Sequence, residues 1–321
     1  MQAEIQTISN LCVNGIPVDT SPERFGELTA SNDLLEDLNA LKARMEEDGY
    51  LYFRGLLDAE RVRAARREIL MKYAIAGEVD TTDHDVMDAI QSEESFIDKL
   101  NLRALSLSIR TGACYEALVH DPALMAFYTR FLGGPVRTFD FKWARFVRPG
   151  EGCGFHADAP YVNRGTKHLY SSWIPIGDVS MVEGALLLLE NSHKSPLIHP
   201  YVDMDADRDQ LGWLGTDPNE VQRRLGGRWL STNFKAGDVM CFSINLVHGT
   251  FDNQSPIKRC RLCSDTRYQL VSAPLDERWN GDDLDPHSDG RVFLPGLIKK
   301  DQNKQFFEEW KPVDRYGRLA L

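Results

Sequence analysis

The spacing of apolar residues changes near residue 134 and divides the chain into two parts. In the first part, apolar side chains recur at helical intervals in three stretches, at 31–49, 58–75 and 124–133, which predicts amphipathic helices. We expect the first helix to begin at Ser31 or Asn32 and to end at Gly49, and the second to be capped by Asp58. A short aromatic run at 50–57 predicts a strand between these two helices.

Beyond residue 134, short apolar runs alternate with Gly, Pro, Asn and Asp. Strands are predicted within 136–147, 168–179, 184–192, 238–253 and 258–271, a spacing typical of a jelly-roll sandwich or barrel. The fold class is therefore α+β with a mainly β core: a double-stranded β-helix, or jelly roll, flanked by N-terminal helices. We expect one domain over 1–321, with a mostly helical part at 1–134, a jelly-roll core at 135–275, a lid-like insert at about 199–230 and a C-terminal extension at 276–321.

Composition narrows the class of protein. The 321 residues carry a net charge of −11 and are 42% hydrophobic and 26% charged, which is an ordinary globular balance. The acidic charge argues against nucleic acid or an anionic membrane as the main partner. No stretch reaches the ~18 apolar residues of a membrane span, and no signal sequence is evident. We expect a cytoplasmic protein that acts on a small molecule. A homodimer is one possible oligomeric state.

The six cysteines are scattered along the chain. Cys260 and Cys263 form the single C-x-x-C, but their surroundings predict a strand, in which residues three apart face opposite sides. We expect free thiols in a reducing compartment.

A histidine and an aspartate stand two residues apart in PGEGCGFHADAPYVN, residues 149–163. In a strand, residues i and i+2 point the same way, so His156 and Asp158 can aim at one point. The neighbouring glycines suit a tight backbone that leads into this pair. An isolated H-x-D is common, so a polar loop is the alternative to a metal site unless a third ligand exists.

A third ligand is available in GDVMCFSINLVHGTFDN, an apolar strand that ends on His248. In a jelly roll, the intervening chain can bring this strand back beside the H-x-D segment. Two histidines and one carboxylate form the facial triad of non-haem Fe(II) oxygenases, which leaves positions open for a bidentate cosubstrate and O2. Zinc favours a closed tetrahedral shell or one open position, and no cysteine belongs to this set.

An arginine follows at a useful distance. Arg259 lies eleven residues after His248, on the next predicted strand, and Arg261 has the same parity. A guanidinium there could hold a carboxylate in a bidentate fork. A metal site beside a carboxylate clamp is what binding of 2-oxoglutarate requires.

These positions, together with WARFVRPG, EGALLLLENSHKS and HGTFDN, resemble the phytanoyl-CoA dioxygenase family over residues 45–275. The resemblance implies an Fe(II)/2-oxoglutarate-dependent dioxygenase. It implies that His156, Asp158 and His248 bind Fe(II), and that Arg259 clamps the distal carboxylate of 2-oxoglutarate. Thr250 falls where the family often has a hydroxyl that helps this carboxylate. Trp173 falls near an aromatic position against the cosubstrate, although a core tryptophan is the alternative.

The same resemblance implies hydroxylation of an unactivated C–H bond of a small metabolite or natural-product intermediate, with release of succinate and CO2. Halogenating relatives lack the carboxylate that Asp158 provides here, whereas desaturation, epimerisation and ring formation stay open as outcomes. Other classes are a cupin-type enzyme with zinc or manganese and a binding protein with a vestigial site. Residues that could contact substrate are Arg145, Tyr161, Asn163, His168 and Trp213.

Overall fold

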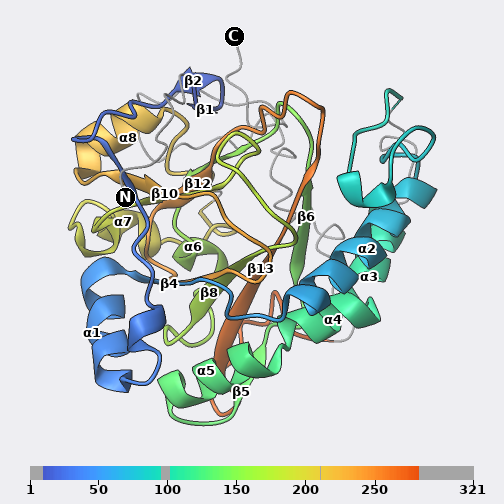
Figure 1. Ribbon diagram of the computed structural model, residues 1–321. Coiled ribbons are helices and arrows are strands. Elements are labelled where there is room, and N and C mark those ends of the chain that lie inside the picture. The colour runs from blue at the N-terminus through green and yellow to red at the C-terminus, as the bar shows by residue number, and fades with distance from the viewer. Residues whose placement is uncertain (1–9, 95–101, 210, 282–321) are drawn as a thin grey trace.

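Two β-sheets face each other at the centre of the computed structural model, which describes residues 10–94, 102–209 and 211–281 (Figure 1). One sheet has the order β4–β11–β8–β13–β5, with β6 also paired to β13, and the other has the order β3–β10–β9–β12–β7. From β7 onward the chain passes repeatedly between the two sheets, which is the predicted jelly-roll topology.

The strands of the first sheet are β4 (Tyr50–Phe53), β5 (Val136–Thr138), β6 (Trp143–Val147), β8 (Tyr170–Pro175), β11 (Val239–Ser243) and β13 (Arg261–Leu270). Those of the second are β3 (Phe25–Glu27), β7 (Cys153–His156), β9 (Leu186–Leu189), β10 (Trp229–Ser231) and β12 (His248–Thr250). A separate hairpin pairs β1 (Cys12–Val13) with β2 (Ile16–Pro17).

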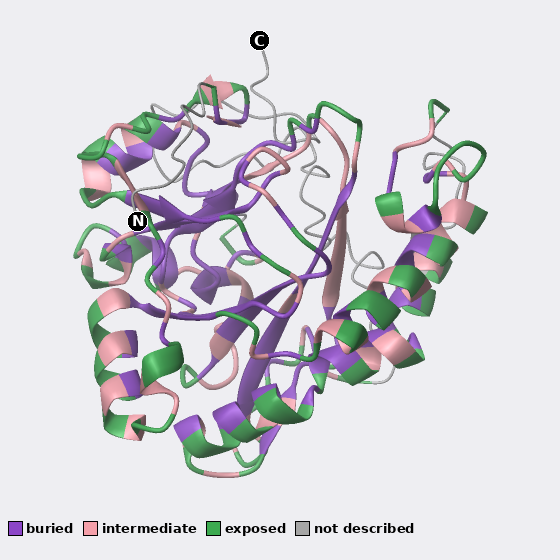
Figure 2. Cartoon of the chain, viewed as in Figure 1, coloured by how far each residue is buried: buried purple, intermediate pink, exposed green. Residues whose placement is uncertain are grey.

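Alternation along the strands of the first sheet supplies two hydrophobic layers. Tyr50 and Tyr52 of β4 join the cluster between the two sheets, whereas Leu51 and Phe53 join the cluster beneath the helices. Successive strand residues point to opposite faces, so one short aromatic strand serves both layers. Figure 2 shows the result: the strands are largely buried, while the helices are buried on one side.

The N-terminal helices cover the outer face of the first sheet. They are α1 (Leu38–Asp48), α2 (Ala59–Ile75), α3 (Leu102–Arg110), α4 (Ala113–Val119) and α5 (Pro122–Leu132). The Asp58 side chain caps α2, and Gly49 ends α1 with φ of 77°, as the sequence predicts. The predicted start of α1 at Ser31 or Asn32 is wrong, because Asp37 caps this helix and residues 32–34 form a separate 3-10 turn. Helices α3 and α4 were not foreseen.

The predicted insert leaves the second sheet between β9 and β10. It contains α7 (His199–Val202) and α8 (Pro218–Leu225), and between them Gly215 forms a bridge to Phe155 of β7. The remaining helix, α6 (Ala159–Val162), directly follows Asp158. The chain from 276 to 281 lies against α6, where the Trp279 indole donates to the Tyr161 carbonyl oxygen at 2.7 Å. The rest of the predicted C-terminal extension lies outside the described residues.

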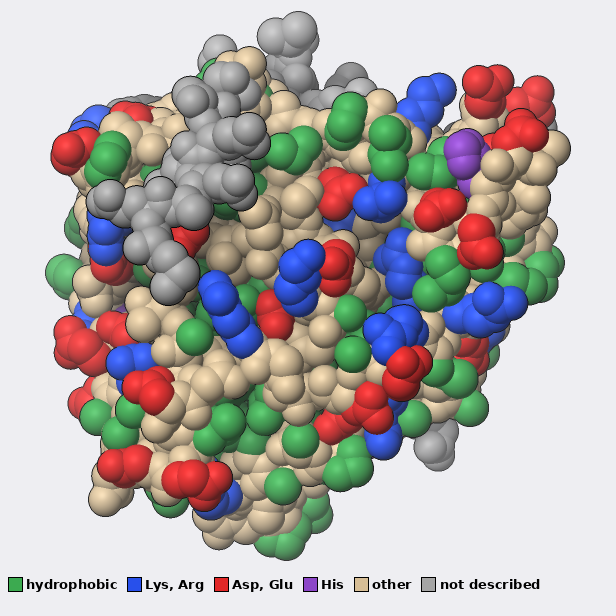
Figure 3. Space-filling view, in the orientation of Figure 1, with side chains coloured by type: hydrophobic (Ala, Val, Ile, Leu, Met, Phe, Trp, Pro, Cys, Tyr) green, Lys and Arg blue, Asp and Glu red, His purple; other side chains and the backbone are tan. Residues whose placement is uncertain are grey.

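The cysteines are free thiols. Cys260 belongs to the cluster beneath the helices and Cys263 to the cluster between the sheets, which confirms that they face opposite sides. Acidic and basic side chains are interspersed over the face drawn in Figure 3. Among the described helices, none is both long and apolar enough to cross a membrane.

Candidate active site

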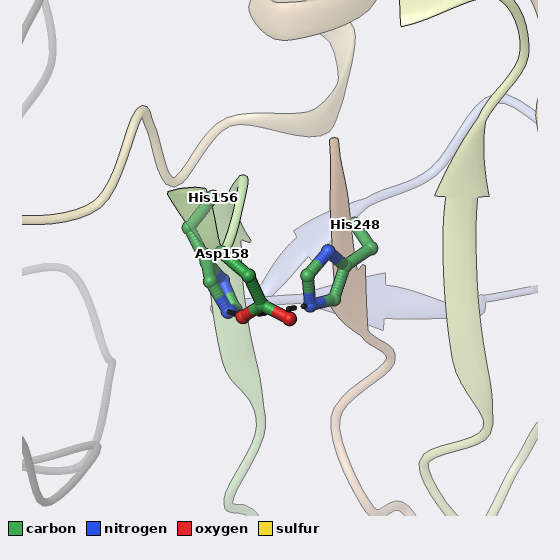
Figure 4. A group of neighbouring side chains, drawn as sticks. All are labelled: His156, Asp158 and His248. Atoms are coloured by element: carbon green, nitrogen blue, oxygen red, sulfur yellow. Dashed lines mark ion pairs between the residues drawn. The ribbon is translucent and has the colours of Figure 1, made fainter. Parts of the chain in front are cut away.

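His156, Asp158 and His248 converge on one point at the edge of the second sheet, as Figure 4 shows. One ligand atom from each side chain lies within 4.8 Å of the others. Oδ1 of Asp158 is 3.8 Å from Nε2 of His156 and 3.9 Å from Nε2 of His248. The three side chains therefore offer one oxygen and two nitrogens to a single small cation.

Strand pairing brings the two histidines together. β12 runs antiparallel to β7 with His248 directly opposite His156, and side chains at directly opposed positions lie on the same face of the sheet. Gly249 makes this approach feasible, because a Cβ there would lie 2.8 Å from the carbonyl oxygen of Cys153. Asp158 comes two residues after His156, where the chain leaves β7 for α6.

Hydrogen bonds at the far side of each ring fix the donor atoms. Nδ1 of His156 lies 3.0 Å from the Gly154 carbonyl oxygen, and Nδ1 of His248 lies 3.0 Å from that of Leu246. Because a carbonyl oxygen only accepts, each Nδ1 carries the proton and each Nε2 presents a lone pair to the centre. Neutral imidazoles oriented in this way are suitable metal ligands.

Asp158 is a buried carboxylate held in its ionised form. Burial by itself would raise the pKa of Asp158, but the Arg267 guanidinium, together with the Ser171 hydroxyl, holds that pKa well below its usual range. Nη2 of Arg267 is 2.6 Å from Oδ1 of Asp158. Two neutral nitrogens and one carboxylate oxygen on one side of the centre fit Fe(II), with the remaining coordination positions left for other ligands.

A cavity opens beside the triad, and two of its members, His156 and Asp158, line it. Its walls are largely aromatic and come from both sheets, from α6, from the insert and from the 276–281 segment; the lining residues are Trp143, Arg145, Cys153, His156, Asp158, Tyr161, Val162, Trp213, Arg267 and Trp279. An aromatic cavity that also carries the charged side chains of Arg145, Asp158 and Arg267 suits a largely apolar small molecule.

The predicted substrate residues divide between the cavity and its surroundings. Arg145, Tyr161 and Trp213 line the cavity, and Arg145 is paired with Asp265. Asn163 is not among the lining residues; its amide donates to the Met204 carbonyl oxygen at 2.6 Å. His168 is exposed on the surface and also lies outside the lining.

The predicted cosubstrate residues occupy different places. Trp173 is 1% exposed in the layer between the sheets, and the Thr250 hydroxyl accepts the amide of Cys153 at 3.0 Å. Arg259 lies away from the cavity: its Nη1 is 3.2 Å from a carboxylate oxygen of Glu183, and its Nε is 3.2 Å from the Asp88 carbonyl oxygen. Nothing in the structure places this guanidinium beside the triad.

Several functional positions were missed from the sequence. Arg267 and Trp143 lie on predicted strands, in which alternate residues face the same side. Arg267 therefore shares a face with Arg261, and Trp143 shares a face with Arg145, so both could have been predicted to face inward. Trp279 was not among the predicted substrate residues, yet it lines the cavity. No local signal distinguishes an anchoring tryptophan from a cavity wall.

A family model of the phytanoyl-CoA dioxygenases (PhyH) matches residues 45–260. The chain belongs to this family. It is 25% identical to the 1-deoxypentalenic acid 11-beta-hydroxylase of Streptomyces exfoliatus over 251 residues, covering 75% of this chain and 84% of that protein. The protein of the same name from Streptomyces arenae is 25% identical over 260 residues, covering 78% and 88%.

Among solved structures, the epimerase SnoN in complex with Fe3+, alpha ketoglutarate and nogalamycin RO has a TM-score of 0.51 and 18% identity, covering 89% of this chain and 96% of that one. This likeness shows the fold. Family membership and the fit of the triad together identify this phytanoyl-CoA dioxygenase family member as an oxygenase that uses iron, 2-oxoglutarate and O2.

We expect Gly154→Ala to displace Trp213 in the cavity wall and to lower the stability of the protein. A Cβ at residue 154 would lie 2.1 Å from the Trp213 ring, so the indole has to move, and overpacking of this kind costs about 1–3 kcal/mol. Urea unfolding should show this loss. Gly134→Ala is the control, because its Cβ would meet only the end of Leu270, at 3.3 Å.

A double substitution identifies the clashing partner. Trp213→Ala should cost less stability in the Gly154→Ala background than in the wild type, because the contact with the new methyl group is then removed. Equal costs in the two backgrounds would show that Trp213 does not pack on residue 154.

Proposed function

We propose that this protein hydroxylates an unactivated C–H bond of a small, largely apolar molecule. The observation that carries the proposal is a buried two-histidine, one-carboxylate centre that opens directly into an aromatic cavity. When bound, Fe(II) with 2-oxoglutarate and O2 supplies the oxidising chemistry, and 2-oxoglutarate leaves as succinate and CO2. The substrate named for the similar hydroxylases, 1-deoxypentalenic acid, is a first compound to test here.

The side chains of this protein supply position and exclusion of water. His156, Asp158 and His248 occupy one side of the centre, so the other side is left for cosubstrate and O2. Tyr161 and Trp279 turn their polar ends to main-chain carbonyl oxygens, of Gly212 and Tyr161 respectively. Their apolar surfaces are then available to hold a C–H bond near the metal in a largely water-free space.

Hydroxylation is the outcome we propose, and other outcomes share its first step. Removal of a hydrogen atom can also lead to desaturation, epimerisation or ring formation, and the choice depends on how the substrate is held. Product analysis by mass spectrometry distinguishes them, since only hydroxylation adds one oxygen atom to the substrate.

We propose Arg261, rather than Arg259, as the partner of the distal carboxylate of 2-oxoglutarate. Arg261 is 3% exposed on β13, and its Nε has no hydrogen-bond partner. Its Nη1 donates to Sγ of Cys263, which faces the layer between the sheets. A buried guanidinium without an acidic partner among the described residues favours an anion. Thr250 and Trp173, buried in the same region between the sheets, are the further candidates for cosubstrate contact.

The Fe(II) centre can be tested by absorption spectroscopy without oxygen. We expect Fe(II) and 2-oxoglutarate together to give a weak visible charge-transfer band in the wild-type protein and none in His156→Ala, because the mutant lacks one ligand. The exposed His168 provides a matched control, and His168→Ala should retain the band. A wild-type protein that binds metal but gives no band would favour a cupin with another metal, and one that binds no metal would favour a binding protein.

Substitutions of Arg261 and Arg259 should have different effects in the same assay. Arg261→Gln should raise the 2-oxoglutarate concentration needed for half of the band by about tenfold or more, which corresponds to loss of a charge-assisted hydrogen bond. Arg259→Gln should leave that concentration nearly unchanged, since its guanidinium is already paired with Glu183. The reverse pattern would assign the clamp to Arg259.

We further propose a single-domain protein of the cytoplasm. The helical N-terminal part contributes β3 and β4, which are edge strands of the two sheets, so it belongs to the same folding unit as the core. None of the six cysteines forms a disulfide among the described residues. Free thiols are typical of proteins from a reducing compartment.

A further inference from the structure

We propose that Arg267 anchors an anionic group of the substrate, and that the substrate is an apolar molecule bearing a carboxylate. This inference rests on the proposed function, since it concerns the same cavity. The guanidinium of Arg267 would hold the carboxylate beside the metal ligands, while the aromatic walls hold the apolar body. Arg267 is thereby a residue that determines specificity, in addition to its contact with Asp158.

The first observation is that Arg267 has hydrogen-bonding capacity to spare. Its side chain lines the cavity and the residue is only 5% exposed. Nη2 contacts Asp158, but Nε and Nη1 have no hydrogen-bond partner. Among the cavity-lining residues that the structure describes, Arg267 is the one with buried, unpartnered nitrogens. A buried donor without a partner costs free energy, so a ligand that accepts from it is favoured.

The second observation concerns what happens to this contact when a cation binds. Oδ1 of Asp158 is the atom that meets Nη2 of Arg267, and it is also the oxygen closest to Nε2 of both histidines. A cation held by the triad therefore competes with Arg267 for the same oxygen. The guanidinium can then turn its free nitrogens to a second anion, and its planar fork of donors matches a carboxylate.

The third observation is the balance of charge. A divalent cation and the dianion 2-oxoglutarate cancel, as do Arg145 and Asp265, which form an ion pair. Arg261, Arg267 and Asp158 then leave one positive charge in a buried site. A monoanionic substrate neutralises that charge, whereas a neutral or cationic substrate leaves it uncompensated.

The fourth observation is the character of the walls. The guanidinium of Arg267 lies 4.5 Å from the centre of the Trp143 ring, and that ring lies 4.8 Å from the Trp279 ring. Trp213 closes the cavity over Gly154. A cavity that holds one guanidinium, stacked on Trp143, together with two further indoles favours a substrate whose charged group is small and whose remainder is rigid and apolar.

Matched pairs of acids and amides test the proposal. The probes are benzoate, adamantane-1-carboxylate and abietate, each with its primary carboxamide, which keeps the shape and removes the charge. Binding is measured by quenching of tryptophan fluorescence in protein loaded with Fe(II) and 2-oxoglutarate without oxygen. We expect at least one acid to bind about tenfold or more tightly than its amide, as a charge-assisted hydrogen bond predicts.

Substitution of the arginine assigns that preference. In Arg267→Gln the ratio of acid to amide affinity should fall to near one, and in Arg267→Lys, which keeps the charge but loses the fork, it should be intermediate. Arg63→Gln changes the net charge equally on the exposed side of α2 and should keep the wild-type ratio. Equal affinities for acid and amide in the wild type, no binding of any acid, or a ratio unchanged in Arg267→Gln would each overturn the proposal.

The charge-transfer band separates this inference from the proposed function. If the wild-type protein gives no band, the proposed function itself fails. If the band forms but acids have no advantage over amides, only the role of Arg267 fails. If Arg267→Gln instead weakens binding of Fe(II) or 2-oxoglutarate and leaves the acid preference intact, Arg267 positions Asp158 or the cosubstrate and does not bind the substrate.

Discussion

The antiparallel pairing of β12 with β7 is the interaction on which the site depends. It sets His248 opposite His156, and β9 holds β12 from its other edge. A shift of this pairing by one residue would turn His248 to the opposite face of the sheet, and the three ligands would no longer meet. Gly249 allows the close approach, and the bridge from Gly215 to Phe155 occupies the free edge of β7. The register is thus specified from several sides.

A preformed charge balance complements this geometry. Asp158 is 2% exposed, and an isolated carboxylate at that depth would be costly to keep ionised. Arg267 and Ser171 keep it charged before any cation arrives. The same contact links the metal ligand Asp158 to Arg267 of β13, which lines the cavity. A substitution that alters metal binding is therefore expected to alter substrate binding, and the reverse.

The sequence predicted the centre well and its surroundings less well, for a physical reason. The period of a strand is fixed, so the shared direction of His156 and Asp158 could be read from their spacing. Parity alone could not choose between two candidate arginines, because the loop between β12 and β13 decides how far along the sheet each residue lies. Arg259 and Arg261 have the same parity, but only Arg261 lies within β13. Trp279 reaches the cavity through tertiary packing, which produces no periodic pattern in the sequence.

The cavity is closed by parts of the chain that lie both within the family match and beyond it. The family match ends at residue 260, whereas Arg267 and Trp279 lie beyond it. The cover of the cavity is tied together by ion pairs among separate segments: Arg164 after α6 meets Asp205 of the insert at 2.6 Å, and Arg278 reaches Asp207 at 3.5 Å. The core that holds the metal fixes the class of reaction. The segments that close over it line the cavity, so we expect them to decide which molecule is oxidised.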